Sequence, residues 1–353
     1  MSFVINADSL EHLKTLEDNK FDSVVTDPPY HLASIVKRFG PGQKAINNRD
    51  TKEGRNGPYH NTARGFMGQT WDGGDIAFNK DFWKEVYRVM KPGAVLLSFA
   101  ATRNYHRMAV AVEDAGFEIF DMIQWLYGSG FPKRKNYLKP ACEPIVMARK
   151  GVNKSLNIDE CRVPGYQWDT TKNRREPKKH KEAVYKLGLK KTGKGEKIDG
   201  RYPANVIHDG SDEVIESFPK QSTSGHWPNV KVTGFGNMGK EVGGQKTAKE
   251  EYFGAGPQVR EDGTVARFFY CAKASKKEKG DTKHPTVKPL ELMRYLVKLV
   301  TPKDGTVLDP FAGTGTTGEA ALLEGRKYYL IEREKNYFKD IEKRLKKVNP
   351  FFV

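Results

Sequence analysis

The sequence has few cysteines, and their spacing excludes two classes of small stabilised domain. Three cysteines, Cys142, Cys161 and Cys271, lie far apart among 353 residues and form no CxxC pair. This pattern argues against a disulfide framework and against a zinc site, and it fits a reducing cytoplasm. We therefore expect a protein without a bound metal.

The sequence also lacks a long apolar run. No segment approaches the roughly 20 residues that span a bilayer. The N-terminus, MSFVINADSLEHL, has neither the basic start nor the continuous apolar stretch of a signal peptide. With 37% hydrophobic residues and a mean hydropathy of -0.68, the composition predicts a soluble cytoplasmic protein with no membrane partner.

The sequence has fewer acidic than basic residues. Sixty basic residues against 44 acidic ones give a net charge of +16 and a pI near 9.5, which favours a polyanionic partner, nucleic acid first. Residues 172–197 alone hold eleven Lys or Arg and three Glu. Such a stretch suits a phosphate-contacting surface, although a solvated, flexible insertion has the same composition.

Strand and helix patterns alternate at both ends of the chain. Up to residue 150 we expect strands at 3–6, 21–26, 94–100, 117–127 and 143–150. Helices are expected after Asp8, at 81–90 (ended by KPG, 91–93) and at 104–116. From 264 onward we expect strands at 266–273, 305–311 and 328–332 and helices at 289–300, 318–325 and 339–347. This alternation predicts an α/β fold, a parallel sheet with helices on both faces. Residues 151–263, rich in Gly, Lys, Asn and Pro, indicate an irregular basic module.

A glycine-rich loop, GTGTTG at 313–318, follows a predicted strand and precedes a helix. Glycines let a ligand approach the backbone, and Glu332 at the end of the next strand could accept hydrogen bonds from ribose hydroxyls. It is not a P-loop, because Glu319 stands where the phosphate-binding lysine would be. NAD, FAD and S-adenosylmethionine all fit this loop, and a purely structural turn fits it as well.

A second motif, TDPPY, ends the strand at 21–26. Each proline fixes its own backbone angle and restricts the residue before it. The Asp27 carboxylate and the Pro28 carbonyl are therefore held in place. In isolation the motif is ordinary turn chemistry.

TDPPY, HPTVKP (284–289) and LDPFAGTGT (308–316) occur in this order. Together they resemble the beta group of amino-methylating DNA methyltransferases that use S-adenosylmethionine. The resemblance implies a Rossmann-like methyltransferase fold, with a mostly parallel doubly wound sheet and a permuted motif order. It covers about 1–150, the catalytic half, and 264–353, the cofactor half; 151–263 would be an inserted target-recognition region.

The resemblance also implies roles for single residues. Asp27 and Pro28 would accept hydrogen bonds from the target amine, Pro29 would stiffen the loop, and Tyr30 would stack on a base swung out of the duplex. The residues expected at S-adenosylmethionine are Asp8, Thr286, Lys288, Asp309, Phe311, Gly313, Gly315 and Glu332. Thr286 and Lys288 would contact its methionine end. Asp8 could equally be only the N-cap of a helix. His31 and His284 are expected to be structural residues and not acid–base groups.

Double-stranded DNA is the expected partner. Its phosphate contacts would come from the loop GSGFPKRKN and from the basic module, namely Lys133, Arg134, Lys135, Arg174, Arg175, Lys178 and Lys179. A homodimer and a cognate restriction endonuclease are compatible with the sequence and not specified by it. The resemblance implies the cytoplasm of a bacterium, or of the host if a phage encodes the protein.

Several functions remain open at this point. Adenine N6 methylation leads, because Asp27 stands where cytosine N4 enzymes of this family usually have Ser. An oxidoreductase built on GTGTTG would leave TDPPY, HPTVKP and the charge unexplained. A DNA-binding protein without catalysis fits poorly with an intact TDPPY. Methyltransferases of RNA or of protein glutamine place the PPY after the glycine motif.

Overall fold

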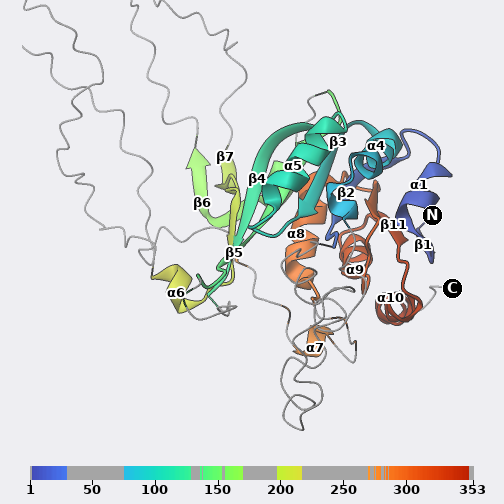
Figure 1. Cartoon of the computed structure of the whole chain (residues 1–353). Helices are drawn as coiled ribbons and strands as arrows, with labels where there is room; N and C mark the ends of the chain where they lie inside the picture. Colours follow the sequence, from blue (N-terminus) through green and yellow to red (C-terminus); the bar gives the residue numbers. More distant parts are fainter. Residues whose placement is uncertain are drawn as a thin grey trace, which may run out of the picture.

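The protein is seen here in a computed structural model. It describes residues 2–29, 75–128, 136, 138–152, 156–169, 197–216, 269–270, 274, 276–279, 282, 284 and 286–349. In this part of the chain the centre is a nine-stranded sheet, in the order β1-β11-β10-β2-β3-β5-β4-β8-β9 (Figure 1). A separate antiparallel pair, β6-β7, lies in the basic module.

The strands of the main sheet are β1 (Phe3–Ile5), β2 (Phe21–Thr26), β3 (Met90–Phe99), β4 (Glu118–Leu126), β5 (Cys142–Arg149), β8 (Val206–His208), β9 (Phe269–Tyr270), β10 (Thr306–Asp309) and β11 (Lys327–Ile331). The small pair consists of β6 (Val163–Asp169) and β7 (Lys197–Arg201). The helices are α1 (Ser9–Lys14), α4 (Lys80–Val89), α5 (Tyr105–Asp114), α6 (Asp212–Ile215), α7 (Lys276–Lys279), α8 (Leu290–Val300), α9 (Thr316–Leu323) and α10 (Lys335–Val348), with short 3-10 turns η5 (Ile76–Phe78) and η6 (Ile158–Cys161).

The expected α/β fold with a mostly parallel sheet is confirmed. The neighbouring strands in the series β1-β11-β10-β2-β3 are all parallel. Strand β5 is antiparallel to both of its neighbours, β3 and β4. The expected end of this helix at KPG (91–93) is confirmed within a residue or two, since α4 ends at Val89, but the next strand begins earlier than the expected 94: β3 starts at Met90, directly after α4. The helix ends before Pro92, which disfavours helical backbone in the residue that precedes it.

Part of the basic module joins the main sheet. Strand β8, at residues 206–208, pairs in parallel with β4 and carries β9 on its other side. The predicted boundaries of the three regions, 1–150, 151–263 and 264–353, stay a prediction. Within the described residues, no helix combines the length and the apolar content needed to cross a bilayer.

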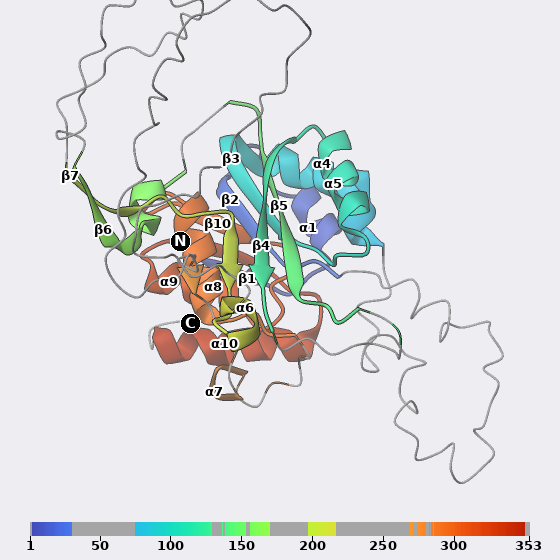
Figure 2. The same cartoon turned by 90° about the vertical axis from the view of Figure 1, so that its left-hand side faces the viewer.

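Alternating side chains along the strands build a core on each face of the sheet. Val24 and Leu96 face α1, α4 and α5, whereas Val25 and Leu97 face α8, α9 and α10. Figures 1 and 2 show these two helical layers on opposite sides of the strands. Because β1, β11, β10, β2 and β3 are parallel, the residues that follow them meet at one edge, which is where open α/β sheets bind ligands.

The glycine-rich loop is shaped by the packing of α9. Gly315, the N-cap of α9, has a φ of 79°, and a Cβ there would lie 2.9 Å from Cγ2 of Ile341 in α10. Arg344 of α10 donates a hydrogen bond to the Thr314 carbonyl (2.8 Å) and pairs with Glu319 (2.6 Å). The loop therefore lies directly against α10.

The Ile341 contact predicts a measurable loss of stability. Gly315→Ala should lower the free energy of unfolding by about 2–3 kcal/mol, because left-handed backbone and overpacking both oppose the methyl group. Gly325→Ala is the matched control, since Gly325 also has a positive φ (68°) but nothing within 4 Å of its Cβ position; it should lose about 1 kcal/mol. Equal losses in urea unfolding would show that the Ile341 contact is unimportant.

Candidate active site

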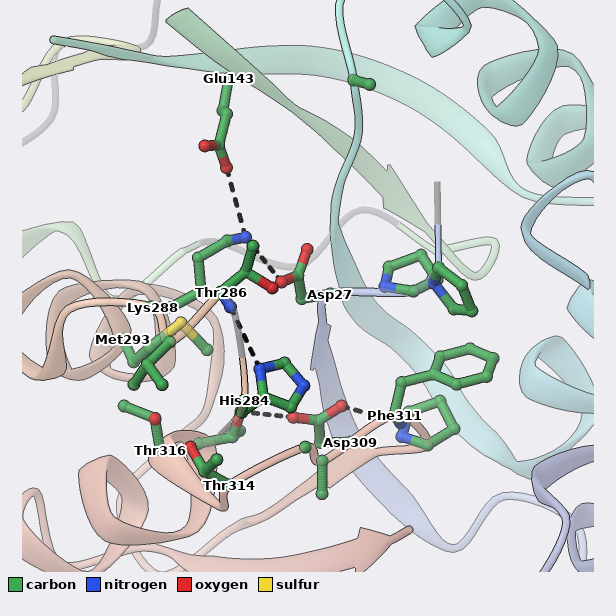
Figure 3. Close-up of a pocket in the computed structure, with 18 of the residues that line it drawn as sticks. Asp27, Glu143, His284, Thr286, Lys288, Met293, Asp309, Phe311, Thr314 and Thr316 are labelled. Atoms are coloured by element: carbon green, nitrogen blue, oxygen red, sulfur yellow. Dashed lines mark hydrogen bonds and ion pairs between the residues drawn. The ribbon is translucent and has the colours of Figure 1, made fainter. Parts of the chain in front are cut away.

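A cavity of about 930 Å³ opens at the carboxyl edge of the parallel strands. Its lining includes the residues that follow β2, β10 and β11, together with the segment that precedes α8. It thus brings the TDPPY, DPFAGTGT and HPTVKP motifs together, as Figure 3 shows for part of the lining. The volume is at the upper end of the ~300–1,000 Å³ typical of ligand pockets.

Asp309, the last residue of β10, ties three elements together. The residue is 3% exposed, and its carboxylate accepts hydrogen bonds from the Thr26 hydroxyl of β2 (2.8 Å) and from the Thr317 hydroxyl of α9. The Phe311 amide donates a third (3.1 Å). Burial raises the pKa of Asp309 to about 6, although these hydrogen bonds act to lower it. All three donors belong to the protein, so Asp309 connects β2, the loop after β10 and α9 next to the cavity.

Glu332 follows β11 and also lines the cavity. Its two oxygens accept hydrogen bonds from the backbone amides of Gly313 and Glu334, both at 2.8 Å. Burial raises the pKa of Glu332 to about 7, and the two amides only partly offset this effect. The carboxylate therefore sits beside the glycine loop, as expected for an acceptor of ribose hydroxyls.

The HPTVKP segment lies over the glycine loop. A Cβ at Gly313 would lie 3.3 Å from Nε2 of His284, so a side chain there would press on the imidazole. The His284 ring packs edge-on against Tyr337 of α10 (4.5 Å), and its Nδ1 accepts a hydrogen bond from the Thr286 amide (3.3 Å). Burial lowers the pKa of His284. This environment agrees with the structural role predicted for His284.

Lys288 forms an ion pair with Asp27, a contact that the motifs did not predict. Its ammonium group, in a side chain 9% exposed, is 2.6 Å from Oδ2 of Asp27 and 3.3 Å from Oε2 of Glu143 (Figure 3). Burial alone would lower the pKa of Lys288, but Asp27 and Glu143 outweigh it and the pKa is raised. Sequence reasoning missed Glu143. The available signal was a carboxylate at the start of the apolar strand EPIVMARK.

Asp8 and Phe311 complete the described lining that the motifs predicted. Oδ1 of Asp8 accepts a hydrogen bond from the Glu11 amide (3.2 Å), so Asp8 is the N-cap of α1 and also faces the cavity. The neighbouring Ser9 hydroxyl donates to the Pro310 carbonyl. Phe311 packs on Phe82 (ring centroids 5.1 Å apart), which holds its ring at the cavity wall.

Some predicted residues lie outside the part of the chain that the structure describes. These are Tyr30, His31, Lys133, Arg134, Lys135, Arg174, Arg175, Lys178 and Lys179. Three exposed cations that the motifs did not predict, Arg103, Lys139 and Arg333, do line the cavity. Among the described residues, no group of three or more His, Cys, Asp or Glu side chains could hold a metal ion.

The chain matches the sequence profile of the N6_N4_Mtase family, described as DNA methylase, over residues 21–343. The Type II methyltransferase M2.LlaDCHI of Lactococcus lactis subsp. cremoris is 22% identical over 355 residues, which cover 98% of this chain and 90% of that protein. The Type II methyltransferase M.HinfI of Haemophilus influenzae is 44% identical over 95 residues, 26% of each chain.

Among solved structures, PvuII DNA methyltransferase (cytosine-N4-specific) has a TM-score of 0.49 at 17% identity, covering 99% of this chain and 90% of that one. The profile match spans most of the chain, including all three motifs at the cavity. The chain therefore belongs to the N6/N4 DNA methylase family and is an S-adenosylmethionine-dependent DNA methyltransferase.

Proposed function

We propose that the protein methylates the exocyclic N6 amine of an adenine that is flipped out of double-stranded DNA, within a specific sequence. The observation that carries this proposal is the position of Asp27. This residue directly follows β2 and lines the cavity that is also lined by Glu332 and Gly313 of the glycine loop. A hydrogen-bond acceptor for the base and a site for the methyl donor thus share one enclosed space.

The cavity fits S-adenosylmethionine. Glu332 can accept hydrogen bonds from the ribose, and Gly313 brings side-chain-free backbone to the cavity lining. Gly315 is not among the lining residues described; the space that its Cβ would fill is taken by Ile341. Phe311 offers an apolar surface, Asp8 an acceptor for the adenine amine, and Thr286 a contact for the methionine end. When bound, the sulfonium supplies an activated methyl group, so the protein has only to position the acceptor amine.

Positioning that amine is the task of the residues after β2. An exocyclic amine is a poor nucleophile because its lone pair is delocalised into the ring. Asp27 and the Pro28 carbonyl accept its hydrogen bonds, which favours a tetrahedral nitrogen and stabilises the positive charge that develops on it. Pro28 and Pro29 hold both acceptors in place before the base arrives. Tyr30 follows directly and would stack on the flipped base.

The choice of adenine over cytosine rests on Asp27, since Ser is the usual residue of cytosine N4 enzymes at this position. DNA binding is supported by the +16 charge, with phosphate contacts proposed from 133–135 and from 174–179. The exposed Arg103, Lys139 and Arg333 add three cations to the cavity lining. Target recognition would fall to 151–263. A homodimer and a partner endonuclease are compatible with this scheme.

The proposed base is tested by mass spectrometry of nucleosides from DNA treated with the protein and S-adenosylmethionine. We expect 6-methyladenine in the product. 4-Methylcytosine without 6-methyladenine would contradict the adenine assignment and leave the cofactor and the fold unaffected.

Removing the acceptor carboxylate should separate binding from catalysis. We expect Asp27→Ala to slow methyl transfer by at least about a hundredfold, because an acceptor for the developing cation is lost. Calorimetry should show a dissociation constant for S-adenosylmethionine within about threefold of wild type. Asp81→Ala, an exposed position on α4, is the matched control and should keep the wild-type rate. A full rate for Asp27→Ala would remove Asp27 from the mechanism.

Cofactor binding should depend on pH through Glu332. The pKa of this carboxyl is raised to about 7, so the ionised form that accepts ribose hydroxyls is present above pH 7 and lost below it. We expect S-adenosylmethionine to bind about tenfold more weakly at pH 6 than at pH 8.

Glu332→Gln should bind weakly and with little pH dependence, whereas Glu113→Gln, an exposed position on α5, should behave as wild type. Retention of the wild-type pH profile by Glu332→Gln would assign the titration to another group.

A further inference from the structure

Glu143 has no role in the mechanism described so far, yet it lies beside the proposed acceptor. We propose that Glu143 and Lys288 are positioning residues that form, with Asp27, a partly buried cluster of formal net charge −1. This cluster fixes the Asp27 carboxylate and favours the cation formed at the target amine. The inference rests on the proposed function and adds two residues to it.

The three side chains converge from distant parts of the chain. Asp27 follows β2, Glu143 belongs to β5, and Lys288 precedes α8. Strand β3 separates β2 from β5 in the sheet. The Lys288 ammonium bridges this gap, lying 4.7 Å from the ring centroid of Phe99 at the end of β3 while it contacts both carboxylates (Figure 3).

The charge of the cluster matches the reaction. Methyl transfer forms a carbon–nitrogen bond as the carbon–sulfur bond breaks, so one positive charge moves from sulfur to the amine. The amine then gives a proton to Asp27, which passes it to water. An Asp27–Lys288 pair alone would be neutral and would stabilise this cation weakly. Glu143 restores one negative charge, and burial limits its screening by solvent.

Lys288 in turn offsets the repulsion between the two carboxylates. Without it, Asp27 and Glu143 would be two like charges that both point at the same space, and their repulsion would displace the Asp27 carboxylate from the target amine. A displaced Asp27 would be a poorer acceptor for the amine. Glu143 therefore adds negative charge, whereas Lys288 holds the two carboxylates in place, and substitutions can separate these two effects.

Other titrating groups around the cluster are Tyr127, Cys142, His284 and Asp309. Burial raises the pKa of Tyr127 and of Cys142 and lowers that of His284. These shifts favour the neutral forms near pH 7. The pKa of Asp309 is raised to about 6. Because all four residues stay in place in the variants below, pH profiles are compared with the wild-type profile.

The test is a double-variant cycle on the full chain, with duplex DNA and methyl-labelled S-adenosylmethionine between pH 6 and 9. Glu143→Gln leaves a neutral cluster and should lower kcat about tenfold at all pH values, less than the loss of a direct contact. Lys288→Met leaves two facing carboxylates whose repulsion displaces Asp27, and its kcat should fall by about a hundredfold. The double variant restores a net charge of −1 and should be at least about tenfold faster than Lys288→Met at pH 6.5.

Controls distinguish this cluster from a structural role and from a cofactor contact. Lys84→Met and Glu113→Gln, both exposed, should match wild type in kcat. Thermal unfolding reports the fold of each variant, and Lys288→Arg should keep the wild-type pH profile even if Lys288→Met is unstable. Affinity for S-adenosylmethionine should change less than threefold in Glu143→Gln and in Lys288→Met.

If the losses in kcat of the two single variants multiply in the double variant, with no rescue, the proposed role of the cluster is wrong. So would an effect of Lys288→Met confined to cofactor affinity, which would return Lys288 to the methionine-end contact predicted from HPTVKP. Wild-type protein that forms only 4-methylcytosine would contradict the adenine proposal, while the same cycle would still test the cluster.

Discussion

The pairing of β2 with β10, closed by the buried carboxylate of Asp309, is the interaction on which the rest of the site depends. Strand β10 lies parallel to β2, with Val307 opposite Ser23 and Leu308 opposite Val24. Asp309 then accepts a hydrogen bond from Thr26, 283 residues away in sequence. This junction joins the half of the chain that carries Asp27 to the half that carries Glu332 and the glycine loop. Without it the two motifs would not share a cavity.

Burial is the common cause of the unusual electrostatics at this junction. It raises the pKa of Asp309 to about 6 and that of Glu332 to about 7. Each buried charge then depends on a particular partner: hydroxyls and an amide for Asp309, two backbone amides for Glu332, and two carboxylates for Lys288. Strong dependence on partners is what a preorganised site requires, because the dipoles are already aimed when the substrate arrives. The site is therefore a set of specific contacts and not merely an acidic pocket.

Much of the fold could be predicted from local patterns. Strand β2 has the bounds expected from FDSVVT, and α8 begins one residue after the start expected from the amphipathic run at 289–300. Periodicity is a local property, so these predictions needed no knowledge of the tertiary structure. Strand β3 begins at Met90, ahead of the expected 94, because Met90 pairs with Phe21 of β2 before the register shifts to Ser23 and Val95; this long-range pairing leaves no local signal. Strand β8 has three residues, too few for a periodic signal. The ion pair of Lys288 with Asp27 spans 261 positions and depends on how β3 separates β2 from β5, so no motif could reveal it.

The proposed reaction requires the methyl donor and the target amine to meet in a single cavity at the carboxyl edge of the sheet. A crystal structure of the protein with S-adenosylmethionine tests this claim most directly. We expect the ribose hydroxyls within hydrogen-bond distance of Glu332 and the sulfonium methyl directed toward Asp27. A bound cofactor whose ribose lies away from Glu332, or whose methyl group faces away from Asp27, would contradict the account.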